Sequence, residues 1–458
     1  MTPCRSKPAV FLLAILLLAP FPLCAEEMED TIQELKAQMQ LMQQRIEELE
    51  RQVAQQKQAG QEPPPAAVRT ADKGASPATP ASGGKNSPAT IQVPGTETTV
   101  TVGGRVKLDT IYNSVSAGGA GGSNSADVAL TPGAIPVDVR GEDDQISFSA
   151  RESRLWAKAR TPTPYGDLGA YLEMDFFASQ SSGDERVSNS HTPRLRHGYG
   201  TLDHVLGGQT WSTFMNVGAF PEHNDSTGPV AMVNIRQPQL RWTQTFTNWD
   251  LQFAIEQPET TLTSASGARI TPDDDRLPDL IGKATWQGGW GQVSLAGMVR
   301  EIRSDGAVIS GVEDSSLGGA LSLAGRIMVT GQDNLRFTLN YGDALGRYMA
   351  LNAFNEGSID AAGEIELTDL YGGFLSYQHW WNQQLRSSFT WSAAMADNDL
   401  SRVPDSVTEW IDTFHANLLW SPVLQATFGL EYIHAYRLLE DDRDGELHRL
   451  QFSAIYNF

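Results

Sequence analysis

Basic side chains that could attract anions recur in segments where every second residue is apolar. Leu335, Phe337 and Leu339 share one face of an extended segment, and Arg336 lies on the other face. Charges that face lipid cost about 2–4 kcal/mol at the bilayer midplane, so we expect such bases to face water inside a barrel. Guanidinium groups bind carboxylates through charge-assisted hydrogen bonds, which predicts reversible anion binding. The bases that this parity turns inward are Arg154, Lys158, Arg194, Arg196, Arg241, Arg300, Arg326, Arg336 and Arg386.

Two acids, Glu173 and Asp175, fall on the inner face of segment 165–178. We expect them to form an acidic patch that faces the basic wall, so that the field across the channel orients a charged solute. Because the inward bases outnumber these acids, the sequence predicts a positive lumen and a preference for anions. The alternative for any single arginine is a structural ion pair with a carboxylate of the wall.

The connection at 212–235 is more apolar than the other long connections. A loop exposed to the medium should not carry this many apolar side chains, so we expect it to fold inward as a constriction loop. Its candidate residues are Phe214, Met215, Asn216, Phe220, Glu222 and Asp225.

The elements that must position these side chains are strands. At the C-terminus, Leu450, Phe452, Tyr456 and Phe458 share one face, and the other face is mostly polar. This pattern suits the closing strand of a barrel with lipid outside and water inside, although an edge strand of a soluble sandwich is an alternative. An aromatic last residue is also typical of outer-membrane barrels, in which the assembly machinery reads it, and we expect Phe458 to serve this purpose.

Residues 96–458 repeat a pattern of strand, short turn, strand and long loop. We count sixteen candidate strands, from 98–113 to 447–458, and the short and long connections alternate. The predicted fold is all-β, a 16-stranded antiparallel transmembrane β-barrel with an N-terminal periplasmic α-helical coiled coil.

Residues 1–25 have the features of a signal peptide: Arg5 and Lys7, then a short apolar run, then a cut expected after Ala25. Lipidation at Cys24 is an alternative, but the residues before it fit a lipobox badly. Both cysteines of the chain lie in this segment, so the mature protein would have none.

Residues 26–59 predict a coiled-coil helix, because apolar residues recur at alternating spacings of four and three. An amphipathic helix lying on the barrel is the alternative. The seam consists of Met28, Ile32, Leu35, Met39, Met42, Ile46, Leu49 and Val53. Residues 60–95 are rich in Pro, Ala, Ser and Gly and predict a linker.

The formal net charge of -21 and the lack of a basic stripe argue against nucleic-acid binding. The eight histidines are scattered and no Gly-x-Ser-x-Gly sequence is present, so we expect no enzyme activity and no catalytic residue. The acidic runs at 273–275 and 440–444 match no calcium-loop spacing, so we expect no metal and no cofactor.

Two stretches, GGQTWSTFM at 207–215 and ESRLWAKA at 152–159, together with the order of coil, linker and barrel, resemble the DcaP-like porin family. The resemblance covers essentially the whole mature chain. It implies a sixteen-stranded trimeric channel with a periplasmic coiled coil that passes small anions, notably dicarboxylates. It also implies that Arg154, Arg196 and Arg241 belong to the basic wall of the eyelet, with Arg236 as a weaker candidate.

We therefore expect a homotrimeric porin in the bacterial outer membrane, in contact with its lipid, through which small anionic solutes diffuse passively. The coiled coil would lie in the periplasm. A phosphate-selective or general porin is one alternative, and a structural tether between the outer membrane and the cell wall is another.

Overall fold

A computed structural model describes residues 89–116, 125–138, 143–177, 188–272, 275–304 and 312–458. The expected signal peptide, the coiled-coil seam and most of the linker lie outside these residues. The last part of the expected linker is described, and Ala89–Gln92 forms a short strand, β1, antiparallel to the start of the first barrel strand. No helix in the described part of the chain is both long and apolar enough to cross a membrane.

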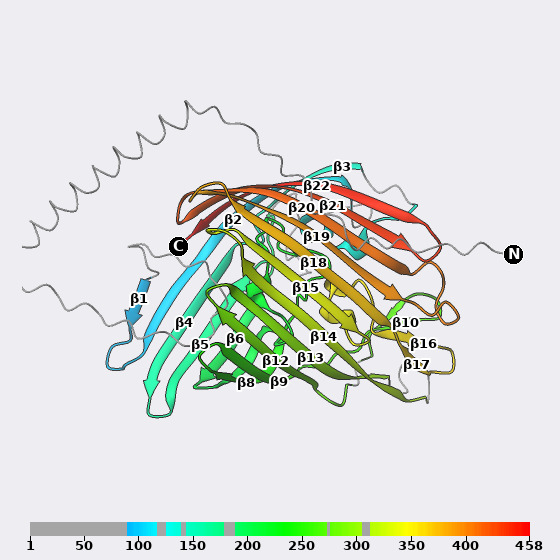
Figure 1. Ribbon diagram of the computed structural model, residues 1–458, viewed down its shortest axis with the longest axis horizontal. Coiled ribbons are helices and arrows are strands. Elements are labelled where there is room, and N and C mark those ends of the chain that lie inside the picture. Colours follow the sequence, from blue (N-terminus) through cyan, green and yellow to red (C-terminus); the bar gives the residue numbers. More distant parts are fainter. Residues whose placement is uncertain (1–88, 117–124, 139–142, 178–187, 273–274, 305–311) are drawn as a thin grey trace, which may run out of the picture. The chain divides into compact units, whose positions relative to one another are not determined.

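The described chain forms a closed antiparallel barrel of sixteen strand positions (Figure 1). Its strands are β2 (Thr99–Val115), β3 (Asp143–Ser149), β4 (Arg154–Thr163), β5 (Gly166–Asp175), β6 (Arg194–Leu202), β7 (Val205–Trp211), β8 (Arg236–Thr245), β9 (Trp249–Glu256), β12 (Asp279–Gly288), β13 (Gly291–Ser304), β14 (Asp314–Met328), β15 (Asn334–Gly342), β18 (Asp369–Trp380), β19 (Leu385–Asp397), β20 (Thr408–Val423), β21 (Ala426–Leu439) and β22 (Asp444–Asn457). Each of the sixteen strands expected from the sequence overlaps one of these positions, so the barrel prediction is confirmed.

One strand position is shared by β3 and β4. β3 pairs with the second half of β2 and β4 with its first half, so the two strands together form one neighbour of β2. Between them, residues 150–153 leave the strand, and the break buries the side chains of Arg151 and Glu152 on the inside. Alternation alone predicts a single strand at 145–161, because the pattern continues across the break.

The barrel closes between the first and last strands. β2 pairs with β22 from Arg105 opposite Asn457 to Asn113 opposite Arg449. The backbones of Gly104 and Phe458 also exchange two hydrogen bonds of 2.9 and 3.0 Å. A Cβ atom at Gly104 would lie 2.5 Å from the carbonyl oxygen of Arg154 and 2.8 Å from the Phe458 ring. Glycine is therefore needed where the last residue meets the first strand.

Apolar and polar side chains alternate between the two faces of the wall. On β15, Leu339 and Tyr341 are 52% and 49% exposed on the outer face, whereas Thr338 and Asn340 are 4% exposed on the inner face. Such alternation suits a barrel with lipid outside. Short turns such as 164–165, 203–204 and 424–425 join neighbouring strands at one end, and the long connections lie at the other end.

Two long connections fold into the barrel and share an apolar core. The first is 212–235, which contains the 3-10 turn η2 (Val217–Ala219). The second is 343–368, which contains η3 (Gly346–Tyr348), η4 (Ala350–Asn352), β16 (Gly357–Ile359) and β17 (Ile365–Leu367). Their shared core includes Phe214, Met215, Val230, Met232, Leu345, Tyr348, Met349 and Phe354, packed against inward residues of β12 to β20.

Two further long connections also pack inward. The connection after β2 contains α2 (Ser125–Val128) and η1 (Pro132–Ala134), and its Leu130 and Ile135 pack against buried side chains of β21 and β22. The connection after β9 contains β10 (Leu262–Ser264) and β11 (Arg269–Ile270), which form a small four-stranded sheet with β16 and β17. The apolar core of this protein therefore lies inside the barrel, between loops and wall.

Candidate channel constriction

The loop 212–235 crosses the lumen and is attached to the wall at many points. Asn216 donates to the Ser294 hydroxyl of β13 over 2.7 Å, and Arg336 of β15 donates to the carbonyl of Phe220. Farther along the loop, Asn417 of β20 donates to the carbonyl of Glu222 over 2.7 Å. The last attachments lie on β2 and β22: Lys107 donates to the Asn224 carbonyl over 2.6 Å, and Arg449 forms a 2.6 Å ion pair with Asp225. Because these partners face the interior, the loop lies within the barrel.

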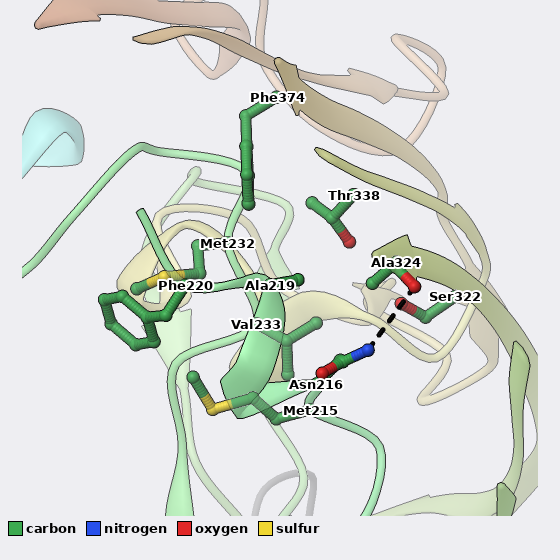
Figure 2. Close-up of a pocket in the computed structure, with 10 residues that line it drawn as sticks. All are labelled: Met215, Asn216, Ala219, Phe220, Met232, Val233, Ser322, Ala324, Thr338 and Phe374. Carbon is green, nitrogen blue, oxygen red and sulfur yellow. Dashed lines mark hydrogen bonds between the residues drawn. The ribbon is translucent and has the colours of Figure 1, made fainter. Parts of the chain in front are cut away.

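The underside of this loop is apolar and covers the wall. Figure 2 shows the small pocket between them, where loop residues such as Met215, Phe220 and Val233 face Thr338 and Phe374 of the wall. The dashed line in the same figure is the hydrogen bond from Asn216 to the Ala324 carbonyl. Of the candidate loop residues, Phe214 and Met215 are therefore core residues and do not line an opening.

The second inward loop supports the first. The Tyr348 ring packs edge-on against Phe214, with centroids 5.9 Å apart. The Tyr348 hydroxyl accepts from Gln237 and donates to Asp279, both over 2.7 Å. From the sequence, residues 343–364 are expected only as one of the long polar loops. The apolar run at 348–351 was a signal that could have shown the inward fold.

Glu173 and Asp175 do not face the basic wall but belong to it. Arg196 donates from Nε to Glu173 over 2.6 Å and from Nη1 to Asp175 over 2.8 Å. Arg194 binds the Asp175 carboxylate with both Nε and Nη2, over 2.9 and 2.8 Å. The prediction of an opposing acidic patch is wrong, because parity fixes the face of a side chain and not its position around the barrel.

A β-bulge explains how β6 supplies so many groups to this wall. His197 pairs with Glu173 and Leu195 with Met174, so Arg196 is an extra residue between them. A bulge re-aims neighbouring side chains, and here both Arg196 and His197 are buried on the inner side.

Several of the candidate bases are already neutralised by carboxylates. Arg300 is fully buried, with Nε 2.9 Å from Asp279 and Nη1 3.0 Å from Glu356. The expectation that Arg300 lines the pore is wrong, because the second loop covers it. Arg386 pairs with Glu222 of the constriction loop. Glu152 forms a 2.8 Å ion pair with Arg154, and it also pairs with Arg105 and Lys107 of β2.

The structure therefore holds more inward carboxylates than the sequence indicated. Those missed include Glu152, Glu256, Asp279, Glu356 and Glu431. Glu152, Glu256, Asp279 and Glu356 lie at a strand end, in a break or in a loop, where alternation does not apply. Glu431 lies within β21, where alternation does place it on the inner face. The expected excess of positive charge is correspondingly smaller.

Four of the candidate bases, and Arg236, have no ion pair among the described residues. They are Lys158, Arg236, Arg241, Arg326 and Arg336. The guanidinium carbon of Arg236 lies 4.3 Å from the centroid of the Trp211 ring. The positive charges of Arg154, Arg194 and Arg196 repel that of Arg236. One nitrogen in each of Arg236, Arg241 and Arg326 has no hydrogen-bond partner in the described part of the chain.

Solvent reaches the wall of β2 to β6 more than the wall behind the loops. The side chains of Arg105, Arg154 and Arg194 are 23%, 21% and 38% exposed, whereas those of Arg300 and Arg449 are 0% exposed. The open part of the lumen therefore borders the arginines of β2 to β6.

The charged residues of the constriction loop keep fixed protonation states at neutral pH. Burial alone would raise the pKa of Glu222, but the hydrogen bond and charge of Arg386 outweigh it, and the pKa lies below its ordinary value. Burial alone would also raise the pKa of Asp225, but the charge of Arg449 outweighs it, so this pKa is lowered too. Burial, with His415 nearby, lowers the pKa of His223 to about 3. The loop thus carries two carboxylates and a neutral histidine.

A family model described as DcaP outer membrane protein matches residues 67–458. The chain belongs to this family. The crystal structure of the outer membrane channel DcaP of Acinetobacter baumannii is similar, with a TM-score of 0.69 at 22% identity, covering 81% of this chain and 100% of that one. OmpT of Vibrio cholerae, expressed in the outer membrane, gives 0.51 at 9% identity, with the same two coverages. No curated protein matches.

Family and fold together identify an outer-membrane β-barrel with the architecture of a porin. At these identities the likeness to the solved channels concerns the fold. The solutes that pass through this channel must therefore be inferred from the residues of this chain.

Proposed function

We propose that this DcaP family member is a passive diffusion channel that prefers small anions. The observation that carries the proposal is the group of inward bases without ion pairs, above all Arg236 and Arg241, whose guanidinium groups keep nitrogens without partners in the described structure. Anions that enter can exchange hydration for contacts with these groups. Each contact is weak enough to release the anion again.

We further propose that dicarboxylates are preferred. Arg236 lies close enough to Arg154, Arg194 and Arg196 for their charges to repel one another. Three carboxylates of the wall offset this repulsion in part, and a solute with two negative groups would offset more of it. The resemblance to DcaP-like porins supports the same substrate class.

The remaining parts of the proposal concern assembly. We propose a homotrimer, held in part by a periplasmic coiled coil at 26–59, with Phe458 read by the barrel-assembly machinery. The channel would act by diffusion alone, without catalysis. A phosphate-selective porin, a general porin and a structural tether are the competing functions, and each gives a different result in the experiment below.

The test is the reversal potential of the purified protein in a planar bilayer under a salt gradient. Wild type should pass chloride more readily than potassium, and succinate should cause brief blockades where phosphate causes fewer. A unit charge about 7 Å away in water contributes about 0.6 kcal/mol, so removing one base should lower the permeability ratio about two- to three-fold. The double variant R236Q/R241Q should therefore lower it about five-fold or more.

A matched control is R160Q, since Arg160 forms an exposed ion pair with Asp167 near a short turn. Its selectivity should equal that of wild type. An unchanged ratio in R236Q/R241Q would contradict the assignment of these arginines. Stronger block by phosphate than by succinate would favour a phosphate-selective porin. Absence of block by either anion would favour a general porin. Absence of conductance would favour a tether.

A further inference from the structure

Two histidines stack where the constriction loop meets the wall. His223 of the loop lies over His415 of β20, with ring centroids 4.4 Å apart and ring planes parallel within 2°. Glu431 of the neighbouring strand β21 accepts a hydrogen bond from His415 Nδ1 over 2.9 Å. His415 and Glu431 are fully buried, whereas His223 is partly exposed.

The hydrogen bonds fix where each ring carries its free lone pair. An ionised Glu431 can only accept, so in that state His415 Nδ1 donates the proton and Nε2 carries the lone pair. His223 Nε2 lies 2.9 Å from the Thr390 hydroxyl, which itself donates to Ser376 over 2.7 Å. Thr390 therefore accepts the proton of His223 Nε2, and the lone pair is on Nδ1.

Both lone pairs lack a partner. Among the described residues, neither His223 Nδ1 nor His415 Nε2 has a hydrogen-bond partner, and both atoms are buried. Native structures leave few buried acceptors unsatisfied, so such a pair needs an explanation. Two bare imidazole nitrogens on adjacent rings are the donor set that Zn²⁺, Cu²⁺ and Ni²⁺ prefer.

The carboxylate completes the pattern. In metal sites, a ligating histidine usually donates its other N–H to a carboxylate, which fixes the tautomer and the ring orientation. Glu431 does this for His415. His223, His415 and Glu431 each offer an atom that could bind a metal ion, and these atoms lie within 4.8 Å of one another.

We propose that His223 and His415, positioned by Glu431, bind one first-row transition-metal dication that ties the constriction loop to β20. The parallel rings must turn toward a common ion, and His223 can do so because it lies on a loop and is partly exposed to the lumen. Open coordination positions would be filled by water or by a solute anion. Calcium and magnesium are excluded by their need for six or more oxygen ligands.

The surrounding charges permit this ion. Asp225 is neutralised by Arg449 over 2.6 Å, and Lys107 lies 3.3 Å from Asp109 and also contacts Glu152. Glu431 is the carboxylate beside the two rings without a basic side chain bonded to it in the described structure. When ionised, Glu431 can therefore offset the charge of a dication.

A second histidine cluster on the outer face provides a matched control. His434, Glu446 and His448 also lie within 4.8 Å of one another. Their nitrogens differ from those of the inner pair, since His448 Nδ1 is bonded to the Tyr432 hydroxyl over 2.8 Å and His434 Nε2 lies 3.4 Å from Glu446. Replacing the two outer histidines removes as many imidazoles without touching the loop.

The experiment measures Cu²⁺ by electron paramagnetic resonance and Zn²⁺ by titration calorimetry on the folded full-length protein in detergent. We expect one equivalent with coupling to imidazole nitrogen, unaffected by excess Ca²⁺ or Mg²⁺. H223Q and H415Q should each weaken binding at least about a hundred-fold. E431Q should weaken it about 10- to 100-fold, as is usual for the carboxylate behind a ligating histidine. H434Q/H448Q should bind as wild type does.

Binding that survives in H223Q but disappears in H434Q/H448Q would overturn the proposal in favour of the outer cluster. Absence of any bound ion in wild type would also overturn it. H223Q changes a loop residue and leaves every barrel strand unchanged, so it remains a test even where H415Q fails to fold. Because binding is measured without ion flow, the result does not depend on the proposed anion selectivity.

Discussion

At the scale of single residues, the charges of the lumen divide into those that hold the structure and those left for a solute. Arg300 and Arg449 are fully buried and paired, and removing either would leave a carboxylate buried without its partner. Truncating one member of such a pair is strongly destabilising. Arg241 and Arg326 have no such pair in the described structure, so their substitution should change conduction and leave folding intact.

Glu222 offers a test of how the constriction loop is anchored. Its folded-state pKa is below the ordinary value of 4.5, because the hydrogen bond and charge of Arg386 outweigh the effect of burial. The ionised carboxylate therefore stabilises the loop at pH values above 4.5, and this contribution is lost as the pH falls through the lowered folded pKa. We expect single-channel current noise in wild type to rise on acidification below pH 4.5, as the carboxylate takes up its proton.

The variant E222Q should show that raised noise already at pH 7 and should not change further on acidification. E313Q is a suitable control, since Glu313 forms an ion pair with Arg303 over 3.4 Å and is 69% exposed. Acid-induced noise of equal size in wild type and E222Q would contradict the role given to Glu222.

At the scale of elements, the inward loops decide how much of the lumen remains open. The strands follow from alternation, because one-sided burial determines which residues can face lipid. The constriction loop was also apparent, because its apolar residues had no other place to be buried. The second loop was missed since its apolar run is short and flanked by polar residues such as Asn352 and Asn355.

Ion pairing inside the barrel could not be predicted from the sequence to the same degree. The inner face of Glu173 and Asp175 was predicted correctly, but their partners on β6 depend on the register and on the bulge at Arg196. Glu152 lies in a break between strands that alternation does not reveal. The pairing of charges is set by angular position around the barrel, which a linear pattern does not contain.

Tyr348 tests whether the second loop supports the first. Y348F keeps the ring that packs on Phe214 but removes the hydroxyl between Gln237 and Asp279. Losing a buried hydroxyl in such a network costs about 1–2 kcal/mol. We expect the unfolding midpoint in detergent to fall slightly and the mean conductance to rise, as both loops loosen.

Y377F is the matched control for this variant. The Tyr377 hydroxyl also donates to a carboxylate, that of Asp333 over 2.8 Å, but Tyr377 lies on the outer face of β18. It should leave conductance unchanged. Equal conductance in Y348F and wild type would show that the constriction loop holds its position without the second loop.

At the scale of the whole molecule, the barrel is stabilised by contacts within a single chain. Its first and last strands pair directly, and its apolar core is built from its own loops. The coiled coil expected at 26–59 is different, because a helix gains most of its stability when its apolar face packs, and this seam would need partner helices. Its seam would therefore contribute to association of chains and leave the path through each barrel unaffected.

Deleting residues 26–59 should leave the single-channel conductance of each barrel unchanged and lower the temperature at which the proposed trimer dissociates. The double variant L35N/I46N should have the same effect, because polar residues in the seam of a coiled coil weaken association without shortening the chain. Q33A/Q43A alters two residues outside the seam and should dissociate as wild type does. The measurement is heat-dependent migration of the unboiled protein in detergent gels. If the oligomer without 26–59 resists heat as well as the full chain, the segment does not hold the subunits together, and contact with another part of the cell envelope becomes its better explanation.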